Sequence, residues 1–230
     1  MSIDRALAAL RVGDFILLHD SSSRENEVDM VISANAVKPK DVATMRRDAG
    51  GLICVALHSQ IADNFGLPYL TEIYREALHR FNVLNATTPN DIPYDERSAF
   101  SITVNHRHTF TGVTDIDRAL TISELGKLGS RALNGPMIEE FGREFRSPGH
   151  VHLLRAANGL QAERMGHTEL VVALAEVASV TPVVAICEML DERTNRALSG
   201  EKAVDYAADH DIEFLEASDV LKAYNGRAKS

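Results

Sequence analysis

The chain has 230 residues, a formal net charge of −9, 45% hydrophobic residues and 25% charged residues. Its acidic balance and the lack of a long basic run argue against nucleic acid or an anionic membrane surface as the partner. No apolar run approaches the roughly 18 residues of a membrane span, so no membrane association is expected. Two cysteines, Cys54 and Cys187, and an N-terminus unlike a secretory signal predict a cytoplasmic protein without disulfides.

Predicted strands and helices alternate along the whole chain. Ser2 is expected to cap a helix over 4–11 that ends at Gly13. The expected strands are 14–20, 29–37, 51–57, 99–106, 149–156 and 182–190. The expected helices are 40–49, with Pro39 before its start and Gly50–Gly51 past its end, 70–81, 121–133, 135–145 and 167–179. A polar loop is expected over 85–98 and a helix–strand–helix tail over 199–227. This alternation predicts one α/β (α+β) domain over residues 1–230, with a sheet covered by helices.

The first candidate site is the stretch HDSSSRENEVDM, residues 19–30, between two expected strands. Glu25, Glu27 and Asp29 repel one another at this spacing unless a cation lies between them. Arg24 beside them has the planar fork that suits a phosphate or a carboxylate. A solvated turn is the alternative, but the position at a sheet end favours a ligand site, and hard carboxylate oxygens favour Mg²⁺ or Mn²⁺ over zinc.

The second candidate site is RMGHT, residues 164–168, at the start of the apolar helix HTELVVALAEVA. A helix N-terminus offers free N–H groups and a partial positive charge, which favour an anion. Gly166 permits close backbone approach, Arg164 adds charge, Thr168 adds a hydroxyl, and a neutral ring nitrogen of His167 can bind a metal. An ordinary capped helix with a satisfied histidine is the alternative.

Three further residues stand out in apolar strands. His150 alternates with His152 in SPGHVHLL, a pair that is sometimes a metal site but more often has one functional histidine or none. Glu188 follows the apolar run VVAIC, where a strand-end glutamate in solvent is the alternative. We expect His150 and Glu188 to sit at sheet ends, to point into the pocket and to act as an acid–base set. Cys54, in GGLICVAL, is most often a small core residue in such a context, and apolar neighbours predict a raised thiol pKa.

Taken in order, these motifs resemble the 3,4-dihydroxy-2-butanone 4-phosphate synthases of riboflavin biosynthesis. The matching stretches are RENEVDM, DAGGLICVAL, FSITVNHR with TGVTDIDRALTI, SPGHVHLLRA, RMGHTEL and CEML. The resemblance implies a Mg²⁺-dependent lyase that converts D-ribulose 5-phosphate to L-3,4-dihydroxy-2-butanone 4-phosphate and formate. It also implies a mixed β-sheet sandwiched between helices, and a homodimer with active sites near the interface. The stretch LTEIYREALHRFNVLN departs from the pattern of bacterial members.

The resemblance also assigns roles to individual residues of this sequence. It implies that Glu25 and His167 bind the metal, and that His150, Glu188 and Cys54 occupy catalytic positions. The implied substrate-binding residues are Arg24, Glu25, Glu27, Asp29, Arg164, Met165, Gly166, His167, Thr168 and Glu188.

Two other functions fit parts of the same pattern. A metal-dependent hydrolase of a phosphorylated small molecule would use the same acidic loop and RMGHT pocket with water as the nucleophile. A non-catalytic sensor of an anionic metabolite would need the arginines and the helix start, but neither His150 nor Glu188. Release of formate, release of phosphate, or binding without turnover distinguishes these three readings.

Overall fold

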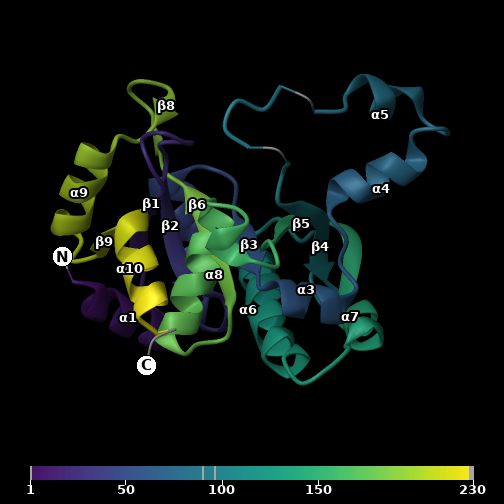
Figure 1. The fold of residues 1–230 in the computed structure, drawn as a ribbon. Coiled ribbons are helices and arrows are strands. Elements are labelled where there is room, and N and C mark those ends of the chain that lie inside the picture. Colours follow the sequence, from purple (N-terminus) through teal and green to yellow (C-terminus); the bar gives the residue numbers. More distant parts are fainter. Residues whose placement is uncertain (1, 90, 96, 228–230) are drawn as a thin grey trace.

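The structure is a computed structural model that describes residues 2–89, 91–95 and 97–227. A seven-stranded mixed sheet runs through its centre, with the strand order β4-β5-β3-β6-β2-β1-β9 (Figure 1). The strands are β1 (Ile16–His19), β2 (Val28–Ser33), β3 (Cys54–Leu57), β4 (Phe100–His106), β5 (Phe145–Arg155), β6 (Val183–Glu188) and β9 (Glu213–Glu216), and a separate hairpin pairs β7 (Leu190–Asp191) with β8 (Arg196–Ala197). Two neighbouring pairs, β1 with β9 and β3 with β5, are parallel, and the other neighbours in the large sheet are antiparallel.

Helices cover both faces of this sheet, so the predicted mixed α/β sandwich is confirmed. The helices are α1 (Ile3–Val12), α2 (Pro39–Thr44), α3 (Ser59–Phe65), α4 (Leu70–Ala77), α5 (Asn82–Ala86), α6 (Asp115–Ala132), α7 (Ile138–Glu144), α8 (His167–Ala178), α9 (Gly200–Asp209) and α10 (Ala217–Arg227). Helices α1, α8 and α10 share one hydrophobic core with the sheet, and α2, α3, α6 and α9 share the other.

The two cores follow from side-chain alternation along the central strands. In β1, Ile16 and Leu18 face the core that contains α8, whereas Leu17 faces the core that contains α6. All three side chains are fully buried, because helices cover the strand on both sides. Strands buried on both faces appear in the sequence as continuous apolar runs, which is why FILL and VVAIC predicted strands correctly.

Several element boundaries differ from those expected. The helix expected over 121–133 begins at Asp115, because the Thr114 hydroxyl accepts the N–H of Asp117 and caps an earlier turn. The predicted capping role of Ser2 is wrong: it occupies the N-cap position, but its side chain makes no capping bond. Its backbone N–H donates instead to the Glu213 carboxylate, 2.9 Å away.

The helix expected over 40–49 begins one residue earlier, at Pro39, and divides into two parts. An α-helix, α2, passes into a π-helical turn at Met45–Ala49, and Gly50 ends that turn with a φ of +86°. The wider turn carries the chain to Gly51, whose N–H donates to the carbonyl oxygen of Glu188, 3.0 Å away. The motif DAGG therefore places the entry to β3 directly against the end of β6.

The segment that departs from the bacterial pattern forms α4 and α5. Figure 1 shows these two helices extending away from the sheet before the chain returns toward β4. The returning loop includes Ile92 and Tyr94, which line the candidate site. Positions 90 and 96 of the expected loop lie outside the described residues. Within the described residues, no helix has the length and apolar character needed to cross a bilayer.

Candidate active site

A cavity of about 230 Å³ opens at one end of the central strands. The loop between β1 and β2, the end of β6, the start of α8 and the chain that returns from α5 form its walls. It brings together seven residues that the sequence singled out, namely Glu25, Glu27, Asp29, Arg164, His167, Thr168 and Glu188. These residues come from three separate motifs, so the fold, rather than sequence proximity, assembles the site.

Asp20 holds the acidic loop in its folded form. Its Oδ2 accepts the N–H of Glu25 at 3.0 Å, and its Oδ1 accepts the N–H of Glu27 at 3.1 Å. The Asp20 side chain is buried, so both of these bonds form away from bulk water. A single buried carboxylate thereby fixes the backbone from which Glu25 and Glu27 project.

Glu25, Asp29 and His167 converge at the base of the cavity. Glu25 Oε2 lies 3.2 Å from His167 Nδ1, and Asp29 Oδ1 lies 3.8 Å from His167 Nε2. Burial by itself lowers the pKa of His167, but the charges of Asp29 and Glu25 outweigh burial and raise that pKa to about 9. Burial also raises the pKa of the Asp29 carboxyl to about 7.

This cluster has the composition of a cation site. Asp20, Glu25 and His167 each offer a ligand atom, and these atoms lie within 4.8 Å of one another. Among the described residues, neither Asp29 Oδ1 nor His167 Nε2 has a hydrogen-bond partner, although both atoms are buried. Unpartnered buried polar atoms are rare, so these two atoms point to a ligand that binds here.

Glu188 lies beside Asp29 because β2 and β6 are neighbours. The two residues pair directly across the antiparallel ladder, so their side chains project from the same face. Glu188 Oε2 accepts the N–H of Leu52 at 2.7 Å, which fixes the half-buried carboxylate. A Cβ atom on Gly51 would lie 2.5 Å from that carboxylate, so only glycine fits at this position.

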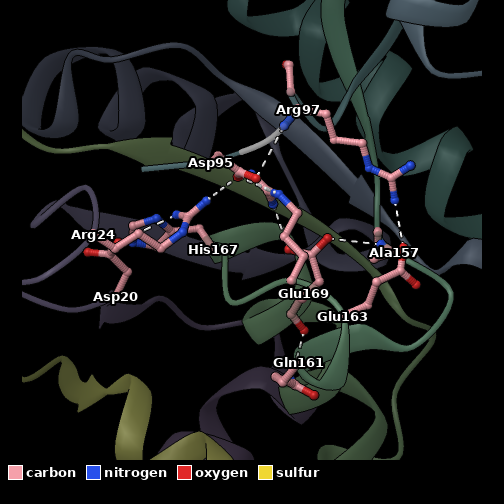
Figure 2. A network of polar contacts seen from close by, with 12 residues as sticks. Asp20, Arg24, Asp95, Arg97, Ala157, Gln161, Glu163, His167 and Glu169 are labelled. Atoms are coloured by element: carbon pink, nitrogen blue, oxygen red, sulfur yellow. Dashed lines mark hydrogen bonds and ion pairs between the residues drawn. The ribbon is translucent and has the colours of Figure 1, made fainter. Parts of the chain in front are cut away.

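Two arginines share one carboxylate at the other side of the cavity. Asp95 Oδ2 accepts from Arg24 Nη2 at 2.6 Å (Figure 2). The same oxygen accepts from Arg164 Nε at 2.7 Å. Arg164 Nη1 also donates to the fully buried Glu169 at 2.6 Å, and Glu169 accepts the N–H of Ala157 at 2.9 Å. Burial lowers the pKa of Arg164, but Glu169 and Asp95 outweigh it and raise that pKa, so the guanidinium stays charged.

The RMGHT motif forms the start of α8, as predicted. Gly166 occupies the N-cap position, and a Cβ atom there would lie 2.2 Å from Arg164 Nη1, so glycine lets the guanidinium lie against the helix start. Thr168 is buried in the first turn and lines the cavity. Met165 is exposed and lines a neighbouring hollow rather than this cavity.

Cys54 lies beneath the cavity rather than in its wall. It is a buried free thiol in β3, and its direct partner in β6 is Ile186, which does line the cavity. Burial raises the pKa of the Cys54 thiol well above its usual value, and the nearby charge of Glu188 adds to the shift. The raised pKa agrees with the expectation from its apolar neighbours.

His150 does not lie where the sequence predicted. It is in the middle of β5 rather than at a sheet end, its side chain is exposed, and it does not line the cavity. Its backbone N–H donates to Asn105 Oδ1, and its ring contacts the amide of the same residue. The error arose because the strand was expected to begin at residue 149, whereas it begins at Phe145.

Sequence reasoning missed three carboxylates of the site, Asp20, Asp95 and Glu169. Asp20 lies within the stretch HDSSSRENEVDM itself, before its cluster of charged residues, and a turn-closing aspartate at that position was a usable signal. Glu169 follows the RMGHT motif and resembled an ordinary acidic residue in the first turn of a helix. Asp95 gave no signal, because it comes from a loop whose fold depends on the rest of the chain.

The fold and the cavity together define a class of protein: an α/β sandwich whose cavity has carboxylate and imidazole groups that could bind a cation. Guanidinium groups that could bind an anion lie beside them. The family model described as 3,4-dihydroxy-2-butanone 4-phosphate synthase matches residues 4–223. The chain is 50% identical over 222 residues to the synthase of that name from Methanothermobacter thermautotrophicus, covering 96% of this chain and 95% of that protein. It is 51% identical to the synthase from Methanosarcina acetivorans, covering 97% and 91%.

Solved structures of synthases with the same name have the same fold. One, in a cation-free form, is 26% identical with a TM-score of 0.77, covering 100% of this chain and 99% of that one. Another, in complex with two magnesium ions, is 30% identical with a TM-score of 0.75, covering 95% and 94%. The chain belongs to the 3,4-dihydroxy-2-butanone 4-phosphate synthase family, which functions in riboflavin biosynthesis.

Proposed function

We propose that this protein is a lyase that converts D-ribulose 5-phosphate to L-3,4-dihydroxy-2-butanone 4-phosphate and formate. The observation that carries the proposal is the convergence of Glu25, His167, Asp29 and Glu188 in one cavity with Arg164. An enzyme that rearranges a ketose phosphate needs side chains that bind the sugar hydroxyls, a base that removes a carbon-bound proton, and a positively charged group that binds the phosphate. The cavity has a candidate for each.

The residues present fit a divalent cation, Mg²⁺ or Mn²⁺. Glu25 and His167 would hold it once the His167 ring has lost its proton, because the hard carboxylate and the imidazole lie 3.2 Å apart and the buried Nε2 atom has no hydrogen-bond partner among the described residues. A bound cation would act as a Lewis acid on the carbonyl and adjacent hydroxyl oxygens of the sugar. The structure of the relative with two magnesium ions supports this cofactor.

The side chains of this chain would divide the remaining work. Glu188, fixed by the N–H of Leu52, would remove the proton from carbon. Asp29 and Glu27 in the cavity wall, and Arg24 from the neighbouring hollow, would orient hydroxyls. Arg164 and Thr168 would bind the phosphate. The acidic loop would close over the reactive intermediates and exclude water, because its charges are neutralised once cation and substrate arrive.

We propose that residues 1–230 form one catalytic domain that acts as a cytoplasmic homodimer with its sites near the interface. Such a dimer would give a role to His150, whose exposed side chain does not line the cavity of its own chain. His150 from one subunit would complete the site of the other and serve the proton transfers together with Glu188. Sedimentation equilibrium would measure the assembly, and a monomer that turns over at full rate would contradict this arrangement.

The decisive experiment incubates the protein with ribulose 5-phosphate and Mg²⁺ and follows the products by ¹H and ³¹P NMR. Formate together with a new phosphorylated four-carbon product is the expected result. Release of inorganic phosphate would instead indicate a metal-dependent hydrolase. Saturable binding without any product would indicate a sensor.

Removal of the Arg164 guanidinium should weaken substrate binding. Arg164→Ala is expected to raise KM by about 10- to 100-fold, since a charge-assisted contact of roughly 1.5–3 kcal/mol is lost. Steady-state kinetics measures the effect. Arg155→Ala is a matched control, because Arg155 is equally shielded and pairs with Asp63 at 2.6 Å, yet does not line the cavity. Equal KM values for the two variants would contradict the phosphate site.

Replacement of the Cys54 thiol should have a modest effect. The raised pKa keeps the thiol protonated near neutral pH, so a covalent role is not expected. Cys54→Ser is expected to lower turnover without abolishing it, because a polar hydroxyl replaces a buried thiol beneath the cavity. Intact-protein mass spectrometry during turnover provides the second readout, and a substrate adduct on Cys54 would contradict the prediction.

Metal binding should depend on pH through His167. In the metal-free protein the pKa of His167 is raised to about 9, so near neutral pH the ring carries a proton that the cation must displace. Affinity for Mg²⁺ is therefore expected to rise by about tenfold per pH unit from neutral pH to about pH 9 and then to level off. Calorimetry in buffers of different ionisation enthalpy would count the released proton. A constant affinity over this range would contradict the role of His167.

A further inference from the structure

A bulge in the β4–β5 ladder places Asn105 against His150. The register is regular at Val104, which pairs with Val151, but Asn105 pairs with Arg146, so the intervening part of β5 bulges out. Gly149 lies in this bulge, and a Cβ atom there would be 1.9 Å from the backbone carbon of Val104. The absence of a side chain at Gly149 therefore lets the bulged segment pack against β4.

The orientation of the Asn105 amide is fixed by backbone groups. The N–H of His150 can only donate, and it lies 2.8 Å from Asn105 Oδ1. The carbonyl of Thr111 can only accept, and it lies 3.4 Å from Asn105 Nδ2. The residue is buried, and Gly112, with a φ of +91°, brings the next loop so close that a Cβ atom there would lie 2.0 Å from Asn105 Nδ2. If the amide were flipped, Asn105 Nδ2 would face the N–H of His150 and Asn105 Oδ1 would face the carbonyl oxygen of Thr111, so neither hydrogen bond could form.

This fixed amide determines the protonation pattern of the neutral His150 ring. Asn105 Nδ2, a donor, lies 3.1 Å from His150 Nδ1. Nδ1 must therefore accept, so the proton of the neutral imidazole lies on Nε2. The ring contacts the buried amide through Nδ1, and the side chain is otherwise exposed. Nε2–H is therefore the ring atom that can donate a hydrogen bond to a group outside this chain's core.

We infer that Asn105 is a positioning residue for His150: it fixes both the ring orientation and the tautomer that presents Nε2–H to the substrate. This inference rests on the proposed role of His150 in the lyase reaction. It makes that role specific, since the neutral ring would donate a hydrogen bond through Nε2 to a substrate oxygen. This arrangement of Asn105 and His150 requires the bulge in β5, the glycines Gly149 and Gly112, and the buried amide together. No single motif of the sequence specifies all of them.

The tautomer can be measured directly by ¹H–¹⁵N NMR on the full chain labelled at histidine. The chain has nine histidines, and comparison with His150→Gln assigns the signals of His150. The expected result for the wild-type neutral ring is an unprotonated Nδ1 and a protonated Nε2. In Asn105→Asp the carboxylate can only accept, so the proton is expected to move to Nδ1. A wild-type ring protonated on Nδ1, or averaged between both tautomers, would overturn the inference without reference to any variant.

Turnover gives the second test. Asn105→Ala and Asn105→Asp are each expected to lower kcat by roughly 10- to 100-fold with little change in KM, because the donor is misoriented while substrate binding remains. Asn64→Ala is the control, since it also removes an amide bond to a backbone carbonyl, that of Ala132 at 2.6 Å, but has no contact with His150. Near wild-type kcat in Asn105→Ala, or equal losses in Asn64→Ala, would overturn the inference.

The two tests separate this inference from the proposed function. If the wild-type protein releases no formate, the proposed lyase activity fails, while the NMR measurement still decides whether Asn105 sets the tautomer. If formate is released and the Asn105 variants keep their kcat, the lyase activity stands and the positioning role fails.

Discussion

Glu25→Gln is expected to abolish turnover at ordinary Mg²⁺ concentrations, and EDTA is expected to do the same to the wild-type protein. Glutamine keeps the length and shape of the side chain but removes the negative charge, and hard divalent cations bind carboxylate oxygens far better than amide oxygens. The lost ligand lies 3.2 Å from His167, and its loss removes one of the two carboxylates that the cluster of Asp20, Glu25 and His167 offers to a cation. Formate production with and without added Mg²⁺ measures the effect.

A matched control separates metal binding from the loss of any glutamate–histidine pair. Glu176 lies 3.3 Å from His58, away from the cavity, so Glu176→Gln removes a comparable pair. This control should keep near wild-type turnover, whereas a high concentration of Mg²⁺ should partly restore Glu25→Gln. Full turnover of the wild-type protein in EDTA would contradict a metal-dependent reaction.

Glu188→Gln should lower kcat by on the order of 10²–10⁴-fold, the range typical for loss of a positioned acid or base. The amide oxygen of glutamine can still accept the N–H of Leu52, so the fold and the position of the side chain should survive. Because glutamine cannot take up a proton from carbon, the loss should appear in kcat while substrate affinity is retained. Turnover, thermal unfolding and substrate affinity are the three measurements.

The alternative explanation for Glu188 is an idle glutamate at a strand end. Glu216 ends β9 as Glu188 ends β6, and Glu216 does not line the cavity, so Glu216→Gln tests that explanation. It should leave kcat nearly unchanged. If Glu188→Gln keeps near wild-type turnover, or fails only because it no longer folds, Glu188 is not the base.

The sequence alone predicted most of the fold because the local signals were strong. Apolar runs such as FILL and VVAIC became strands buried on both faces, and the tail over 199–227 became α9, β9 and α10. Errors occurred where tertiary contacts set a boundary. The π-helical turn at Met45–Ala49 and the start of β5 at Phe145 depend on contacts with distant strands, which residue periodicity does not encode.

For the candidate site, the sequence determined the chemical groups: the carboxylates of the RENEVDM loop, the RMGHT helix start and the Glu188 strand end. Tertiary structure decided which of these groups meet. The β2–β6 pairing sets Asp29 beside Glu188, and a distant loop brings Asp95 onto both arginines. It also removed His150 from the cavity of its own chain and set it against Asn105. Charge and hydrogen-bonding capacity belong to each residue, whereas distance and burial arise only when the sheet aligns its strands.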